Sequence, residues 1–323
     1  MAGNTRKTVY ITRKIPAPAI ALLEEHFDVR MNTERRNARR SEIKRALKDA
    51  HALLCLLTDP IDDALLASAP NLKIVANMAV GFDNIDLEAA ARRGIMVTNT
   101  PGVLTETTAD LAWALILAVA RRLVEADRFT REGRFTGWEP MLFLGGDVHG
   151  KTLGIIGFGR IGQAVARRAL GFEMRLLYAD EEKAPESLER TLKARRVSLE
   201  ELLRDSDFVT LHVLLNESTR GLIGKRQLGM MKPSAYLINT SRGPVVDERA
   251  LVEALKKGTI AGAGLDVFEH EPKLARGLIN LPNVVLLPHI GSASIETRTK
   301  MALMAAENII AALSGRIPPN LVS

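Results

Sequence analysis

The first hundred residues alternate short apolar runs with segments of helical spacing. From Pro16 onward, for example, apolar side chains recur at Ile20, Leu23 and Phe27, the spacing of an amphipathic helix. Strands that alternate with helices form parallel sheets. The pattern therefore predicts an α/β domain with strands at 9–13, 27–31, 52–57, 72–78 and 95–100, separated by helices.

This alternation is interrupted at residues 99–102, where Asn-Thr-Pro-Gly is a turn signal. One long helix is expected from Thr105 to Glu132, with Thr105 or Thr107 as its cap. It is apolar nearly all round in its first half, so other elements must cover it on several sides. Such a helix suits a core between domains or subunits, and residues 133–150 are expected to form an extended arm.

A second alternating series begins at Lys151, and its six expected strands fit a Rossmann-type domain. A last helix, at about 293–314, is expected to cross back to the N-terminal domain and make it discontinuous. We predict two Rossmann-like, doubly wound parallel-sheet domains, the first of them flavodoxin-like, formed by residues 1–101 with 290–323 and by 102–289. The six strands of the second domain are expected at 152–157, 174–179, 208–213, 235–240, 262–268 and 284–288.

The composition is that of an ordinary globular protein, with 46% hydrophobic and 25% charged residues in a chain of 323. The net charge of +6 comes without a single basic patch or aromatic partners, so nucleic-acid binding is not expected. The longest apolar run, Leu111–Ala120, is shorter than the roughly 20 residues of a membrane span. With no secretory signal and one apolar-flanked cysteine, Cys55, we expect a cytoplasmic protein, and no metal site is expected.

A glycine-rich turn opens the second domain. The strand Leu153–Ile156 runs into Gly157-Phe158-Gly159-Arg160-Ile161-Gly162 and then a helix. This GxGxxG pattern, between a strand and a helix, is typical of dinucleotide binding. Gly157 would permit the tight turn, Gly159 the approach of the pyrophosphate and Gly162 close helix packing.

An acidic turn follows the next strand. Asp180 stands eighteen residues after Gly162, where a carboxylate accepts hydrogen bonds from the adenosine ribose hydroxyls of NAD. It would also repel the extra phosphate of NADP, and Glu181 and Glu182 add to this repulsion. The sequence therefore favours NAD as the cofactor.

Three chemically suitable residues follow the ends of the last three expected strands: Arg242, Glu271 and His289. Ligands of open α/β sheets bind at the carboxyl ends of strands, so these side chains are expected to converge. Arginine can bind a carboxylate through two hydrogen bonds, and histidine can exchange a proton near neutral pH. A glutamate beside the imidazole would orient it. Spacing alone does not distinguish Glu271 from the neighbouring Glu269 and His270.

Taken together, the motifs resemble the D-isomer-specific 2-hydroxyacid dehydrogenases, and within them the glyoxylate/hydroxypyruvate reductases. The resemblance implies NAD-dependent reduction of a small 2-oxo acid, with NADH preferred over NADPH. It also implies an NAD-binding domain at 102–289, a substrate domain in the remainder, and a homodimer embraced by the long helix and the arm. The segments that carry it are Asn77–Asn84, Gly94–Pro101, Gly150–Gly162, Asn239–Asp247, Gly262–Pro272 and Leu287–Ser292.

The resemblance implies that His289 is the general acid/base, that Glu271 orients it and that Arg242 binds the substrate carboxylate. It selects Glu271 over Glu269, because the family's glutamate lies five residues after the aspartate that here is Asp266. Together with the glycine motif, it assigns cofactor contacts to Gly157, Gly159, Arg160, Ile161, Gly162, Asp180, Thr240, Ser241, Arg242, Asp266, His289 and Gly291. It assigns substrate contacts to Leu56, Val80, Gly81, Arg242 and His289.

Two departures from the family pattern stand out. Archaeal-type glyoxylate reductases often carry a Ser-Arg-Thr-like turn where this chain has an acidic one from Asp180, and His270 stands where glutamate is common. Two alternatives remain open on the sequence alone. One is a short 3-phosphoglycerate dehydrogenase, and the other is an NAD-binding module like the corepressors of this fold, which keep the same three residues.

Overall fold

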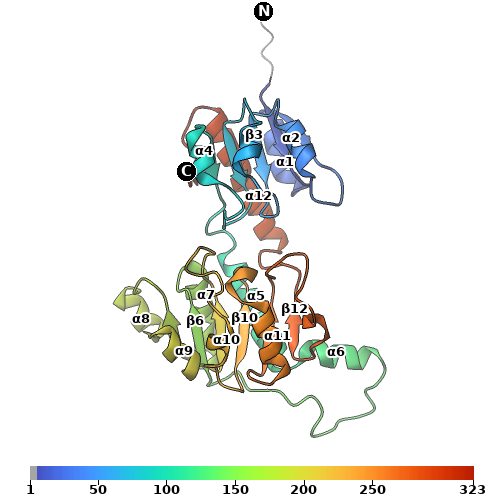
Figure 1. The fold of residues 1–323 in the computed structure, drawn as a ribbon, viewed down its shortest axis with the longest axis vertical. Coiled ribbons are helices and arrows are strands. Elements are labelled where there is room, and N and C mark those ends of the chain that lie inside the picture. The colour runs from blue at the N-terminus through green and yellow to red at the C-terminus, as the bar shows by residue number, and fades with distance from the viewer. Residues whose placement is uncertain (1–5) are drawn as a thin grey trace, which may run out of the picture. The chain divides into compact units, whose positions relative to one another are not determined.

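The computed structural model describes residues 6–323 (Figure 1). The chain divides into two compact units. One runs to Leu104 and resumes at Ser292, and the other spans Thr105–Gly291. Each is built on one parallel sheet with helices on both faces, so the predicted α/β fold is confirmed.

The sheet of the first unit has the strand order β2-β1-β3-β4-β5, which is the flavodoxin-like order. Alternate residues of each strand point to opposite faces. Helices α1 and α12 cover one face and α2, α3 and α4 the other. The strands are Thr8–Ile11 (β1), Asp28–Met31 (β2), Ala52–Cys55 (β3), Ile74–Asn77 (β4) and Met96–Thr98 (β5). The helices are Ala17–Glu24 (α1), Arg40–Ala46 (α2), Asp63–Leu66 (α3), Leu87–Arg92 (α4) and Ile295–Leu313 (α12).

The last helix belongs to this first unit. Helix α12 packs against α1 and β4, with Met301 and Ile309 among its buried residues. After it, the backbone N–H of Val322 donates to the Val97 carbonyl at 2.8 Å, which adds the C-terminal residues to the edge strand β5. The first unit is therefore made of two separate stretches of the chain.

The second unit has the Rossmann order, extended by one strand: β12-β11-β10-β9-β6-β7-β8. Helices α5 and α7 cover one face, and α9, α10 and α11 the other. The strands are Thr152–Ile156 (β6), Arg175–Ala179 (β7), Ala194–Arg196 (β8), Phe208–Leu211 (β9), Tyr236–Asn239 (β10), Gly262–Leu265 (β11) and Val284–Leu286 (β12). The helices are Thr105–Ala120 (α5), Leu123–Arg131 (α6), Arg160–Ala169 (α7), Glu186–Leu192 (α8), Leu199–Asp205 (α9), Lys225–Leu228 (α10) and Glu248–Lys256 (α11).

The single long helix expected from Thr105 to Glu132 is wrong, because the structure has two helices there. Helix α5 ends at Ala120, and Arg122 adopts a left-handed backbone with φ 53°. The Ala120 carbonyl, which the next helical turn would have used, accepts instead from Gly146 N–H at 2.9 Å. The extended arm thus returns to the helix and ends it.

The expectation of six strands in the second domain also needs correction, because there are seven. The additional strand, β8, lies at the edge of the sheet beside β7. Of its three residues only Ala194 is buried, while Arg195 and Arg196 are exposed. A strand this short and this polar has no apolar alternation from which to predict it.

Candidate functional site

The glycine turn between β6 and α7 has the geometry that the motif predicts. Gly157 has φ +87°, and a Cβ there would lie 2.7 Å from the His212 carbonyl carbon, so glycine is required. A Cβ on Gly162 would lie 2.2 Å from the Gly157 oxygen. Gly159 faces open space, and no described side chain caps α7 at this end. The first-turn amides of α7, from Arg160 and Ile161 onward, are therefore available to an anion.

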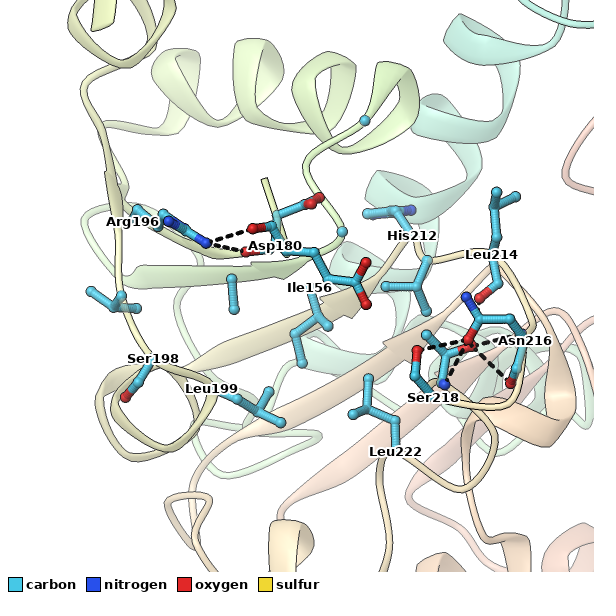
Figure 2. Close-up of a pocket in the computed structure, with 17 residues that line it drawn as sticks. Ile156, Asp180, Arg196, Ser198, Leu199, His212, Leu214, Asn216, Ser218 and Leu222 are labelled. Carbon is cyan, nitrogen blue, oxygen red and sulfur yellow. Dashed lines mark hydrogen bonds between the residues drawn. The ribbon is translucent and has the colours of Figure 1, made fainter. Parts of the chain in front are cut away.

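A cavity of about 900 Å³ adjoins this turn (Figure 2). Pockets of this size bind small molecules and parts of cofactors. Asp180 follows β7 and lines the cavity, and its carboxylate accepts from the N–H of Phe158 at 2.5 Å and of Glu182 at 3.1 Å. The carboxylate thus ties the end of β7 to the glycine turn at the cavity wall.

Arg196 also lines this cavity, and sequence reasoning missed it. Its guanidinium donates to the carbonyl oxygens of Asp180 and Glu181, both at 2.8 Å (Figure 2). Arg196 ends β8, the strand that the sequence pattern did not predict. A fixed positive charge therefore stands beside the acidic turn, where the sequence predicts only the negative charges from Asp180 to Glu182.

Three buried polar atoms in this unit have no partner within the described residues. They are Ser206 Oγ, directly after α9, His212 Nδ1, in the cavity wall, and Thr240 Oγ1, at the end of β10. Burial lowers the pKa of His212 to about 3, so its ring is neutral at physiological pH, and its Nε2 pairs with Thr210 Oγ1 at 2.9 Å. Buried polar atoms in proteins nearly always have a partner, and a bound ligand or an ordered water can supply one to His212 and Thr240.

The turn that carries Arg242 is held by a buried side chain, Asn239. Its amide nitrogen donates to the Arg242 carbonyl at 2.9 Å, and its oxygen accepts from Ser241 N–H at 3.0 Å. The Arg242 guanidinium in turn donates to the Ser241 carbonyl at 3.0 Å. A Cβ on Gly243 would lie 1.9 Å from the backbone of Phe268, so this turn packs directly against the loop after β11.

The loop after β11 places Glu271 beside His289. Nδ1 of His289 lies 3.0 Å from Oε2 and 3.2 Å from Oε1 of Glu271, and Oε1 also accepts from Phe268 N–H at 3.1 Å. Burial raises the pKa of the Glu271 carboxyl, but four other effects outweigh burial, so the pKa is lowered. They are the hydrogen bond to His289, the charge of the His289 ring, the hydrogen bond from the Phe268 amide and the charge of Arg242. An ionised carboxylate only accepts, so we assign the ring proton to Nδ1, which leaves Nε2 for chemistry.

Asp266 fixes the backbone around His289. Its buried carboxylate accepts from the N–H of Ile290 and of Gly291, each at 2.7 Å, and its carbonyl accepts from His289 N–H at 2.8 Å. Burial raises the pKa of Asp266, against the opposing effect of these two amides and of the His289 charge. His289 has φ 55°, a left-handed backbone that costs about 1–3 kcal/mol and needs such support.

Arg242, Glu271 and His289 thus lie at one edge of one sheet, because β10, β11 and β12 are adjacent, parallel strands. The positive charge of Arg242 contributes, as the smallest of the causes, to the lowered pKa of the Glu271 carboxyl.

In the other unit, asparagines hold the loops that carry Leu56, Val80 and Gly81. Asn84 donates to the Leu56 carbonyl at 3.2 Å, and Asn99 donates to the Val80 carbonyl at 2.8 Å. The carbonyl and N–H of a trans peptide point in opposite directions, so the second bond turns the Gly81 N–H away from Asn99. Sequence reasoning had no signal for these asparagines, because each acts through space on a distant loop.

A family model for the D-isomer specific 2-hydroxyacid dehydrogenase, NAD binding domain, matches residues 113–291. The chain belongs to this family. It is 56% identical to a glyoxylate reductase of Korarchaeum cryptofilum over 98% of this chain and 95% of that protein. The expected resemblance is thereby confirmed, and the chain is an oxidoreductase with a domain for a nicotinamide dinucleotide.

Solved structures agree with the fold. A Thermus thermophilus protein superposes with a TM-score of 0.92 at 46% identity, covering 98% of this chain and all of that one. An NADPH-dependent glyoxylate/hydroxypyruvate reductase of Sinorhizobium meliloti, in complex with NADP and malonate, superposes with a TM-score of 0.88 at 35% identity, covering 99% and 97%. Within residues 6–323, no helix is long and apolar enough to cross a membrane, and no cluster of side chains is arranged to bind a metal ion.

A nicotinamide dinucleotide fits the second unit of this dehydrogenase. The glycine turn leaves no room for side chains at Gly157 and Gly162, the first-turn amides of α7 are open, and the adjoining cavity is of suitable size. The unpartnered atoms of His212 and Thr240 add polar groups that a bound ligand can satisfy.

Proposed function

We propose that this dehydrogenase reduces a small 2-oxo acid, glyoxylate or hydroxypyruvate, to the corresponding 2-hydroxy acid. The observation that carries the proposal is the Glu271–His289 pair at 3.0 Å, with the charge of Arg242 acting on the same carboxylate. The reaction needs a group that binds a carboxylate and a group that protonates a ketone oxygen. The name of the Korarchaeum relative, glyoxylate reductase, supports this substrate class.

In the proposed mechanism, Arg242 binds the substrate carboxylate through the two parallel N–H groups of its guanidinium. Nε2 of His289 donates a proton to the carbonyl oxygen, and takes it back in the reverse direction. Glu271 keeps Nδ1 protonated and stabilises the charged ring. Asp266 holds the backbone from which the imidazole projects, and the contact with Glu271 holds the ring.

The chain would hold the cofactor through the glycine turn and the first-turn amides of α7, including those of Arg160 and Ile161. When bound, the reduced nicotinamide supplies the hydride. Further cofactor contacts are proposed for Thr240, Ser241, Arg242, Asp266, His289 and Gly291.

We propose NADH as the preferred form of the cofactor. Asp180 would accept from the ribose hydroxyls, and its negative charge with those of Glu181 and Glu182 would repel the 2′-phosphate of NADPH. Arg196 opposes this preference, because its positive charge would attract the 2′-phosphate. Its guanidinium is held at the same turn, 2.8 Å from two carbonyl oxygens. The Sinorhizobium relative is NADPH-dependent, so the preference has to be measured on this chain.

We further propose that Leu56, Val80 and Gly81 contact the substrate, with the outward amide of Gly81 binding its carboxylate. A homodimer is proposed through the arm, where Phe135, Trp138 and Met141 are 57%, 83% and 75% exposed. Exposed apolar clusters of this kind mark interfaces between proteins.

The test is NADH oxidation by the purified protein with glyoxylate, hydroxypyruvate, pyruvate and 3-phosphohydroxypyruvate side by side, repeated with NADPH. Turnover of glyoxylate or hydroxypyruvate with NADH well above the other pairs is the expected result. Preference for the phosphorylated acid would assign the chain to 3-phosphoglycerate oxidation instead. Tight NADH binding without turnover of any of the four acids would favour the binding-module alternative.

A further inference from the structure

A glutamate outside the catalytic triad is buried behind it. Glu248 begins α11 and is only 3% exposed. Burial raises the pKa of its carboxyl, and the negative charge of Glu269 raises it further. The hydrogen bonds from the Glu269 and Ala275 amides and the charge of His270 lower this pKa, but they do not outweigh burial. A glutamate serves a helix N-terminus equally well when it is exposed, so its burial requires another explanation.

Both carboxylate oxygens of Glu248 accept hydrogen bonds from one loop. Oε1 accepts from Glu269 N–H at 2.7 Å, and Oε2 accepts from Ala275 N–H at 3.1 Å. The contact is reciprocal, since the Glu248 N–H donates to Oε2 of Glu269 at 3.4 Å. One side chain thus holds the 269–275 loop at both of its ends.

Glu271 lies inside the segment that Glu248 holds. Its carboxylate makes its contacts with His289 from this loop and is supported locally by Phe268 N–H. The loop also packs on the Arg242 turn, where a Cβ on Gly243 would collide with Phe268. A shift of the loop would therefore change the distance from Glu271 to His289.

We propose that Glu248 is a positioning residue of the reaction: by accepting hydrogen bonds from the Glu269 and Ala275 amides, it holds the Glu271 carboxylate against Nδ1 of His289. This inference rests on the roles proposed above for Glu271 and His289. Glu248 itself touches neither substrate nor cofactor. It acts only through the loop, which makes its effect dependent on the presence of the Glu271 carboxylate.

The experiment is a double-mutant cycle on the full-length enzyme with NADH and the best of the four acids. Glu248→Ala alone should lower kcat/KM by about 10- to 100-fold, the effect of misplacing a catalytic group by about an ångström. The same change made in the Glu271→Ala background should lower it by less than about threefold, because the two residues act as one unit. NADH binding, followed by protein fluorescence, should stay close to wild type in every variant.

Two further variants keep the test decisive. Glu253→Ala is the matched control: it lies on the same helix, its side chain is 59% exposed, and it pairs with Lys256 and Lys257 at 3.8 Å, so kcat/KM should be unchanged. Glu248→Gln keeps the shape of the side chain and one hydrogen-bond acceptor. It should lower kcat/KM by less than the alanine variant, and it provides the test if the alanine variant does not fold. It should also have a larger effect on kcat than on the KM for the acid.

The outcomes separate the two proposals. The positioning role would be overturned if Glu248→Ala lowered kcat/KM equally with and without the Glu271 carboxylate. It would also be overturned if Glu248→Ala lowered the melting temperature and left kcat/KM at the wild-type value. Glu271→Ala with wild-type activity would instead overturn the proposed role of Glu271 itself.

Discussion

Asp266 and His289 are joined by backbone and side chain at once. The His289 N–H donates to the Asp266 carbonyl, and the Asp266 carboxylate accepts from the next two amides, Ile290 and Gly291, at 2.7 Å each. The left-handed backbone of His289 is therefore held from both sides. Asp266 therefore fixes the backbone that carries the imidazole, in addition to the cofactor contact proposed for it.

Replacing Asp266 by Asn tests this relationship. An amide of the same shape presents an NH₂ donor to one of the two backbone N–H groups, so one buried donor loses its acceptor. The free energy of unfolding should fall by about 1–3 kcal/mol, as measured by urea denaturation. Turnover should fall as well, because the His289 turn is loosened. Unchanged stability together with unchanged turnover would show that the turn is fixed by other contacts.

His289→Ala removes the proposed general acid. Turnover should fall by about 10²–10⁴-fold, while NADH binding is mostly retained, because the glycine turn and the cavity supply most of the proposed cofactor contacts. The matched control is His270→Ala, because that side chain is 78% exposed and its ring lies 3.8 Å from Glu269. Single-turnover rates at pH 7 measure both. Comparable losses in the two variants would contradict the assignment of the proton to His289.

Arg242→Lys distinguishes a bidentate contact from a simple charge. Lysine keeps the positive charge but not the planar pair of N–H groups, so KM for the 2-oxo acid should rise and kcat should fall. Steady-state kinetics with glyoxylate provide the measurement. A lysine variant with wild-type KM and kcat would mean that charge alone is sufficient, and that the guanidinium does not bind the carboxylate as proposed.

The sequence predicted both sheets, because apolar runs mark buried strands. It also predicted the sheet edge at which the proposed catalytic triad of Arg242, Glu271 and His289 lies, because parallel strands have their carboxyl ends at the same edge. It did not predict what holds the triad in place. Asn239, Asp266 and Glu248 act on backbone amides and carbonyls, and a sequence contains no pattern for which backbone groups lie within reach. Arg196 was missed for a related reason, since its strand is a three-residue edge with two exposed arginines.

Glu271→Gln should change how stability depends on pH. Folding lowers the pKa of the Glu271 carboxyl, so between the folded and the unfolded pKa the unfolded chain binds more protons and stability rises with pH. The stability advantage of the wild type over the variant should be complete above about pH 5 and shrink as the pH falls through the lowered pKa.

Denaturation of both proteins from about pH 5.5 downward isolates this effect, because histidines with ordinary pKa values near 6.5 are already largely protonated there. A difference in unfolding free energy that stays constant down to the lowest pH at which both fold would contradict the lowered pKa of Glu271.

The last prediction concerns the cofactor. Asp180→Ala removes the proposed ribose acceptor and one of the charges that repel a 2′-phosphate, while Arg196 remains. The ratio of kcat/KM for NADH to that for NADPH should fall by about tenfold or more, the effect of about 1.4 kcal/mol. Adding Arg196→Ala to this variant should reverse part of the gain with NADPH, because the guanidinium, which donates to backbone carbonyl oxygens of this turn, leaves a positive charge beside the position of the phosphate. If the ratio is unaltered in the Asp180 variant, the acidic turn does not select the cofactor, and the preference of this chain must come from contacts elsewhere along the dinucleotide.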